Sequence, residues 1–81
     1  MRILLSYPTE IGVFDLGQCT QKKYHPIFND TSLGSFDTMQ DAVDALVQNK
    51  TDQVINPETR EVVDTSTLGI LEDYTQWDSN Y

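Results

Sequence analysis

The most regular pattern of apolar and polar positions in the chain lies between residues 36 and 50. Apolar side chains recur there at intervals of three and four, at Met39, Ala42, Val43, Leu46 and Val47. This spacing places them on one face of a helix with 3.6 residues per turn, while acidic and amide side chains occupy the other faces. The segment therefore predicts an amphipathic helix that packs on a core.

The start of this helix is predicted at Asp37. Its carboxylate can accept hydrogen bonds from the free amides of the first turn, and Gln40, three residues on, can reach back to it. Asp41 then lies near the positive end of the helix dipole. Asn49 and Lys50 suit the other end.

Short apolar runs before the helix predict strands. Residues 2–6 and 11–16 are of strand length and predict a hairpin, and residues 23–28 predict a third strand. Pro26 lacks the amide donor that a central strand needs, so this third strand belongs at a sheet edge or contains a bulge. Residues 29–35 are rich in turn formers and predict an exposed loop.

A second hairpin is predicted after the helix. Residues 53–55 and 60–63 flank Asn56-Pro57-Glu58-Thr59, in which Asn and Pro occupy the positions that a type I turn favours. Arg60 then has to adopt a left-handed conformation, for which Gly would be easier.

The C-terminal region is predicted to contain a short helix over residues 66–74, because Leu68, Leu71 and Tyr74 follow at intervals of three. Gly69 counts against this helix, because glycine in a helix interior costs about 1 kcal/mol of stability relative to alanine. Residues 75–81 are predicted to be a tail that is ordered only if Trp77 docks, and Tyr81 is predicted to be exposed.

Together these elements predict one α+β domain over residues 1–81. A small antiparallel sheet of about four to five strands packs against the central amphipathic helix. The chain has 81 residues, of which 38 % are apolar, so it can build one small core and has no room for a second domain.

Net charge narrows the choice of partner. Thirteen acidic and five basic residues give −8, and residues 30–81 hold eleven of the acidic side chains. Phosphate backbones and anionic lipid repel such a chain, so we expect no direct contact with nucleic acid or a membrane, and we expect a basic protein as partner. The apolar run at residues 3–5 is too short for a signal peptide, so we expect a cytoplasmic protein.

Catalysis and metal binding receive little support. Cys19 and His25 are the single members of their residue types and form a Cys–His nucleophile pair in principle, but no family signature surrounds them. We therefore predict a non-enzymatic protein without cofactor. Asp37, Asp41 and Asp44 recur at helical spacing, yet hard cations need about six oxygen ligands, so a solvated acidic face explains them better than a metal site.

The carboxylates suggest a different use, which is mimicry of nucleic acid. Acidic side chains three and four apart on a helix have β-carbons about 5–6 Å apart, close to the spacing of successive phosphates. An acidic face can thus occupy a groove built for a polyanion. The carboxylates available are those of Asp37, Asp41, Asp44, Glu58, Glu61, Asp64, Glu72 and Asp73.

The leading hypothesis is an inhibitor that covers a basic, nucleic-acid-binding surface of its partner. In size, acidity, aromatic content and single cysteine, the chain resembles small phage-encoded anti-restriction and anti-CRISPR inhibitors, although no motif carries this resemblance and no residue role follows from it.

Two alternatives stay open. The first is a non-inhibitory adaptor or assembly subunit that binds through apolar and aromatic side chains, with Tyr74 and Trp77 as the binding candidates and charge serving solubility alone. For Trp77 the competing interpretation is a lid on the core. The second alternative is a small enzyme or ligand carrier built around Cys19 and His25. Oligomeric state is left open.

Overall fold

The computed structural model describes residues 1–79. Its elements are β1 (Arg2–Thr9), β2 (Gly12–Gln18), β3 (Tyr24–Phe28), β4 (Thr31–Ser32), α1 (Met39–Val47), β5 (Val54–Ile55), β6 (Val62–Val63), two 3₁₀ turns (Thr65–Thr67 and Tyr74–Gln76) and β7 (Asp78–Ser79). Five strands form an antiparallel sheet in the order β4-β3-β2-β1-β7, and β5 and β6 form a separate hairpin.

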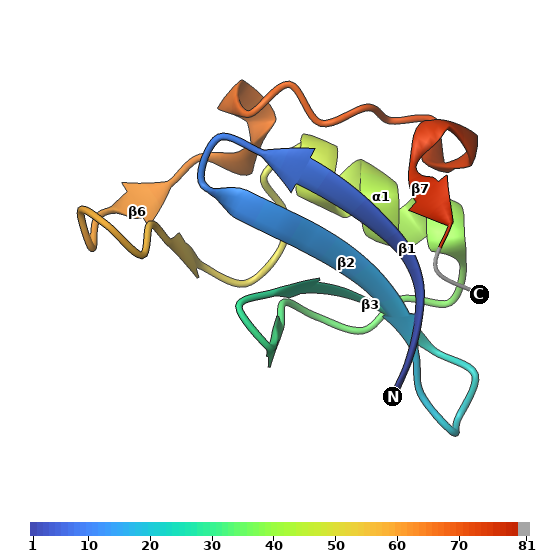
Figure 1. Cartoon of the computed structure of the whole chain (residues 1–81). Coiled ribbons are helices and arrows are strands. Elements are labelled where there is room, and N and C mark those ends of the chain that lie inside the picture. The colour runs from blue at the N-terminus through green and yellow to red at the C-terminus, as the bar shows by residue number, and fades with distance from the viewer. Residues whose placement is uncertain (80–81) are drawn as a thin grey trace.

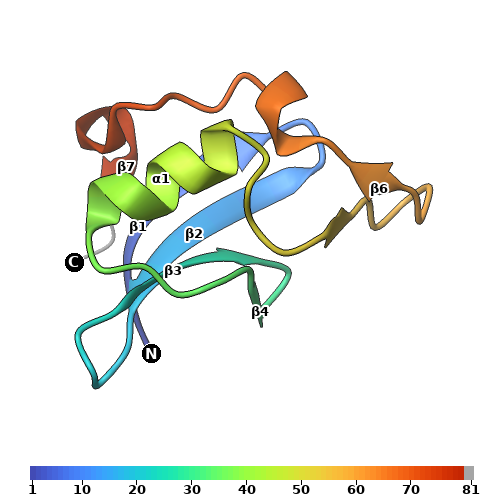
Figure 2. The ribbon, with the colours of Figure 1, turned by 180° about the vertical axis from the view of Figure 1, so that it is seen from behind.

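The α1 helix covers one face of the main sheet. It lies behind β1 and β2 in Figure 1 and in front of them in Figure 2, where the view is reversed. The second hairpin projects from one end of the molecule in both views. This arrangement confirms the predicted α+β fold, with a single amphipathic helix packed on a small antiparallel sheet.

Alternation along β2 builds the core beneath α1. Phe14 and Leu16 are fully buried at 0 % exposure, whereas Val13 on the other face is 51 % exposed. Phe14 stacks on Phe28 of β3 with ring centroids 4.5 Å apart, and Leu46 of α1 belongs to the same buried cluster. The helix face predicted from apolar spacing is therefore the face that meets the sheet.

The backbone groups of Pro26 face away from β2, toward the side of β3 where the short β4 lies, and this explains how a proline fits into the strand. A residue in an antiparallel strand directs its N–H and C=O to the same side. The Pro26 carbonyl accepts from the Leu33 amide at 2.7 Å, beyond the short β4. The missing N–H therefore faces the sparsely paired side, and the ladder to β2 is intact.

The predicted helix start at Asp37 is wrong by one residue. Thr38 is the N-cap: its backbone is extended (φ −132°, ψ 159°), and its Oγ1 accepts a hydrogen bond from the Asp41 amide at 3.0 Å. Asp37 instead forms an ion pair with Lys23. The pairing of Asp37 with Gln40 in a capping box is consequently wrong as well.

Residues 29–35 are more ordered than the predicted loop. Asn29 and Asp30 both have positive φ, 53° and 63°, which is the geometry of a primed two-residue hairpin turn. The turn folds β4 back on β3, and Leu33 is buried at 3 % exposure. The sequence pattern cannot reveal this hairpin, because β4 has only two residues and is too short to show the alternation of a strand.

The hairpin after α1 has the predicted turn. The Asn56 side chain accepts from the amides of Glu58 and Thr59, and Arg60 has φ 62°. The left-handed conformation expected at Arg60 is therefore confirmed.

The C-terminal α-helix predicted over residues 66–74 is absent from the structure. Two 3₁₀ turns replace it, each capped by an aspartate, Asp64 and Asp73. Gly69 between them has φ 70°, which interrupts helical continuation. After the second turn Trp77 is buried at 5 % exposure, and β7 pairs with β1; residues 80–81, which include Tyr81, lie outside the described residues.

Candidate binding groove on the acidic face of α1

A groove of about 390 Å³ runs along the solvent side of α1. We call it the α1 groove. Its lining residues are Ser35, Phe36, Asp37, Asp41, Asp44, Ala45, Gln48 and Lys50. It therefore brings together the three carboxylates that the sequence placed first among the binding candidates.

The carboxylate of Asp44 is held in one orientation. Gln40, one helical turn earlier, donates from Nε2 to Asp44 Oδ1 at 2.9 Å and to the backbone carbonyl of Glu72 at 2.8 Å. The Glu72 carbonyl thus fixes Gln40, and Gln40 fixes Asp44. A ligand that binds Asp44 meets a carboxylate whose conformational entropy is already reduced.

Asp37 is oriented by a different contact. It precedes the N-cap, so the helical repeat does not place it, and the ammonium group of Lys23 holds it through an ion pair. The hydrogen bond from this ammonium and its charge both lower the pKa of Asp37 below the ordinary 3.8. Asp37 is therefore ionised across the neutral range.

Asp41 lies between these two aspartates and is exposed. Its carboxylate makes no hydrogen bond or ion pair with any residue in the described part of the chain. Of the three carboxylates in the α1 groove, it is the one wholly available to an incoming cation.

Phe36 gives the α1 groove an aromatic component. Its backbone exchanges two hydrogen bonds of 2.8 Å with Tyr24, which fixes the start of the groove to β3. A partly buried ring beside carboxylates suits a guanidinium or ammonium group, because such cations are attracted both to the ring face and to the anions.

Sequence spacing alone did not identify every residue of the α1 groove. Gln48 could have been found, because it follows Asp44 by four and Asp41 by seven positions and so lies on the same stripe. Phe36 and Lys50 could not, since both lie outside α1 and depend on how the chain enters and leaves the helix.

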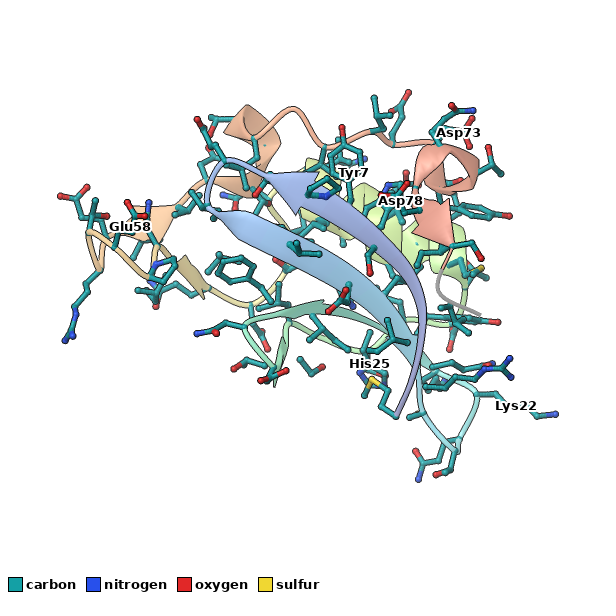
Figure 3. All side chains as sticks on the ribbon, in the orientation of Figure 1. Tyr7, Lys22, His25, Glu58, Asp73 and Asp78 are labelled. Carbon is teal, nitrogen blue, oxygen red and sulfur yellow. The ribbon has the colours of Figure 1, made fainter. Side chains whose placement is uncertain are left out.

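The other predicted acidic residues do not extend the α1 groove. Glu58 lies at the tip of the β5–β6 hairpin, while Asp73 lies at the opposite end of the molecule (Figure 3). Glu61 follows the same hairpin turn as Glu58. The eight acidic candidates therefore belong to separate surfaces.

Asp64 and Asp73 have structural roles in the 3₁₀ turns. Asp64 accepts from the amide and the hydroxyl of Ser66, and Asp73 accepts from the amide and the hydroxyl of Thr75. These hydrogen bonds lower the pKa of Asp73. Glu72 contributes its backbone carbonyl to Gln40, as described above.

Tyr74 and Trp77 lie at a second hollow, of about 450 Å³, with Leu5 and Met39. Trp77 is almost wholly buried; its ring lies 5.4 Å from that of Tyr7, and its Nε1 donates to the Leu71 carbonyl at 3.0 Å. Its indole is part of the core, so little of this side chain is accessible to a partner. Tyr74 is only partly buried.

In the part of the chain that the structure covers, no three His, Cys, Asp or Glu side chains gather closely enough to hold a metal ion. Within residues 1–79 there is also no helix with the length and apolar character needed to cross a membrane.

Comparison with known proteins finds no relative of this chain. No protein-family model, curated protein or solved structure matches the chain significantly. Function has to be argued from the residues themselves.

Proposed function

We propose that this chain binds a basic segment of a partner protein in the α1 groove and thereby covers a surface that the partner uses for nucleic acid. The observation that carries the proposal is the convergence of Asp37, Asp41 and Asp44 beside Phe36 in one groove. The chain acts in this proposal by binding, without a chemical step.

Electrostatics support a basic partner. The net charge of −8 attracts a positively charged surface and raises the rate of encounter. Asp41 and Asp44 are three residues apart on α1, so their β-carbons are separated by about 5–6 Å, which is close to the spacing of phosphates along a strand. A site built for successive phosphates can accept this pair.

The arrangement also favours tight contact at the groove itself. Gln40 and Lys23 orient two of the carboxylates before binding, which reduces the entropy lost on association. Asp41 is left to form a new ion pair, and Phe36 offers a ring face to a guanidinium group.

An NMR titration with an oligoarginine peptide tests the groove. The amide signals of residues 37–50 should shift on binding, and Asp41→Asn/Asp44→Asn should weaken the affinity. The matched control is Glu58→Gln/Glu61→Gln, which removes the same charge from the far hairpin. Equal weakening by both double variants would show that net charge alone attracts the peptide, and the α1 groove would lose its role.

Capture of partners from a lysate tests the second half of the proposal. A partner of the expected kind is retained by the original chain and by Glu58→Gln/Glu61→Gln, is lost with Asp41→Asn/Asp44→Asn, and is displaced by duplex DNA. Partners that are retained by all three proteins and ignore DNA would contradict nucleic-acid mimicry.

A second candidate function is an adaptor that binds through apolar surface. Ile55 and Val62 favour it, because they are direct cross-strand neighbours on the β5–β6 hairpin and are 44 % and 61 % exposed. Ile55→Ser/Val62→Ser should abolish partner capture under this alternative and leave it intact under the groove proposal.

A further inference from the structure

Cys19 and His25 lie on the sheet face that α1 does not cover. Leu16 points into the core under α1, so alternation directs Gly17 and Cys19 to the opposite face. His25 is the direct cross-strand partner of Gly17 and therefore shares that face. The Cys19 amide donates to the Lys23 carbonyl at 3.1 Å, so the ladder continues to this position.

The register makes Cys19 and His25 diagonal neighbours. Side chains in this relation have β-carbons separated by about 7 Å or less, within reach of an imidazole and a thiol. Gly17, opposite His25, contributes no side chain between them. Met1 and Ile27 fill the space over Gly17, where an added Cβ would lie 2.7 Å from Met1 Sδ and 2.9 Å from Ile27 Cδ1.

Hydrogen bonding fixes which nitrogen of His25 can act as a base. Nδ1 lies 2.7 Å from the Gly34 carbonyl, and a carbonyl oxygen only accepts, so Nδ1 carries the proton of the neutral ring. Nε2 then holds the lone pair. It is buried and has no hydrogen-bond partner among the described residues. An imidazole lone pair without a partner is thus held on the face that carries the thiol.

The surroundings of the thiol favour its ionised form. A hydrogen bond from the His25 imidazole is the main cause that lowers the pKa of Cys19 to about 7, and the backbone N–H groups of Lys23 and Gln21 act in the same direction. Cys19 is partly exposed, so a small reagent can reach it.

Cations surround this end of the sheet although the chain is acidic overall. Arg2 is the cross-strand partner of Gln18, next to the β2–β3 turn, which carries Lys22 and Lys23. Lys22 extends from the turn into solvent, on the same side of the molecule as His25 (Figure 3). Asp15, the nearest acid along β2, accepts a hydrogen bond from Ser6, and Asp37 is paired with Lys23. Screening over about 8 Å at physiological salt makes these local cations outweigh the distant carboxylates.

We propose that Cys19 is a thiol–disulfide exchange site for anionic low-molecular-weight disulfides, with His25 as the base that accepts the thiol proton. The thiolate attacks one sulfur of the disulfide; the S–S bond of the reagent breaks, and a new S–S bond joins Cys19 to one half of it. The other half leaves as a thiolate and takes the proton from His25. Cys19 is oxidised, the reagent is reduced, and no further oxidant is needed.

The pH dependence of the reaction with oxidised glutathione, followed by intact mass, tests the pair. The rate should rise with a midpoint at about 7. Two variants should move this midpoint to about 8.5, the value of an ordinary cysteine: His25→Gln, and Cys19→Ser/Thr20→Cys, which moves the thiol one position along the turn and out of the diagonal register with His25. The second variant keeps His25, so the test does not depend on whether His25→Gln folds.

Two results would overturn the proposal. One is a midpoint of about 8.5 in the original chain. The other is a midpoint of about 7 that both variants retain. At pH 7 the original chain should react only about threefold to fivefold faster than either variant, because a thiolate of lower pKa is also a weaker nucleophile, so the midpoint is the sharper readout.

The preference for anionic reagents has its own test. Lys22→Gln should slow exchange with oxidised glutathione and leave exchange with the cationic disulfide cystamine unchanged or faster. Equal slowing with both reagents would remove the preference for an anion.

Discussion

Lys23 and Asp37 form an ion pair that joins the β2–β3 turn to the residue before the N-cap of α1. The pair lowers the pKa of Asp37 in the folded chain relative to the unfolded chain, where the ordinary value of 3.8 applies. A depressed pKa of this kind contributes stability above pH 3.8, and that contribution is lost as the pH falls through the folded value. Both side chains are exposed, at 46 % and 75 %, so the contribution is small and sensitive to salt.

Lys23→Gln is therefore expected to return the Asp37 carboxyl to an ordinary pKa, as measured by NMR titration. Urea unfolding should show a small loss of stability at pH 6, and this loss should shrink as the pH falls through the folded pKa of Asp37. Lys22→Gln, which removes the neighbouring charge, is the control and should leave the titration of Asp37 unchanged. A similar change with both variants would mean that general charge, rather than the pair, sets this pKa.

Leu46→Ala is expected to lower the free energy of unfolding by about 2–5 kcal/mol, because Leu46 is 0 % exposed and lies where α1 meets the sheet. In a domain of this size that is a large part of the total stability. Gln48→Ala, on the exposed side at the end of the helix, should change it by less than about 0.5 kcal/mol. Thermal and urea unfolding measure both, and an unchanged midpoint for Leu46→Ala would contradict the core assignment.

Arg60→Gly is expected to stabilise the chain. Arg60 has φ 62°, a conformation that costs about 1–2 kcal/mol in residues with a Cβ. Glycine avoids this strain and loses about 0.5–1 kcal/mol through its greater freedom when unfolded, so a net gain of about 0.5–1 kcal/mol remains. Glu58→Gly, in the same turn but without positive φ, should destabilise instead. A loss of stability with Arg60→Gly, measured by urea unfolding, would show that the Arg60 side chain matters more than its backbone.

Binding through the α1 groove is expected to weaken steeply as salt rises through the physiological range, because several carboxylates act together and screening shortens to about 8 Å at 0.15 M. Surface plasmon resonance at two salt concentrations, with oligoarginine or a captured partner, measures this. Asp41→Asn/Asp44→Asn should slow association where these charges stay at the rim, or should cost about 2–5 kcal/mol through faster dissociation where one is buried against Arg or Lys. A salt-insensitive complex that tolerates this variant excludes mimicry through α1.

Cys19→Ser and His25→Gln are expected to leave binding at the α1 groove intact, since both residues lie on the sheet face away from α1. The same resonance assay measures this, with circular dichroism to confirm folding. A folded Cys19→Ser variant that no longer binds would place the thiol in the binding mechanism and revive the enzymatic alternative.

The helices, strands and turns that can be predicted from the sequence are those that a local, repeated residue pattern specifies. The helix face around Leu46 and the left-handed residue at Arg60 follow from spacing and turn chemistry that a few residues carry. The sequence cannot place the N-cap, because Asp37 and Thr38 are both good capping residues; in the structure Thr38 caps α1, and Asp37 pairs with Lys23, which is distant in sequence. The predicted C-terminal helix is wrong because Gly69 adopts positive φ there. The spacing of Leu68, Leu71 and Tyr74 is equally compatible with short 3₁₀ turns.

The site was predictable in part for the same reason. Asp41 and Asp44 share a helix face, which spacing reveals. The role of Gln40 depends on its contact with Glu72, and that of Phe36 on its pairing with Tyr24. No local sequence pattern predicts either contact. Likewise the sequence offers Cys19 and His25 as a pair, but their placement on one face follows from the β2–β3 register.

The pairing of Leu5 with Ser79 and of Ser6 with Asp78 has a consequence for how the chain is made. A ribosome releases β1 long before β7, so β1 has no partner on its outer edge while almost all of the described chain is synthesised. The core lacks the indole of Trp77 for the same period. The described sheet is thus completed only after residues 77–79 have left the ribosome, and until then β1 has an unpaired outer edge and the core is incomplete.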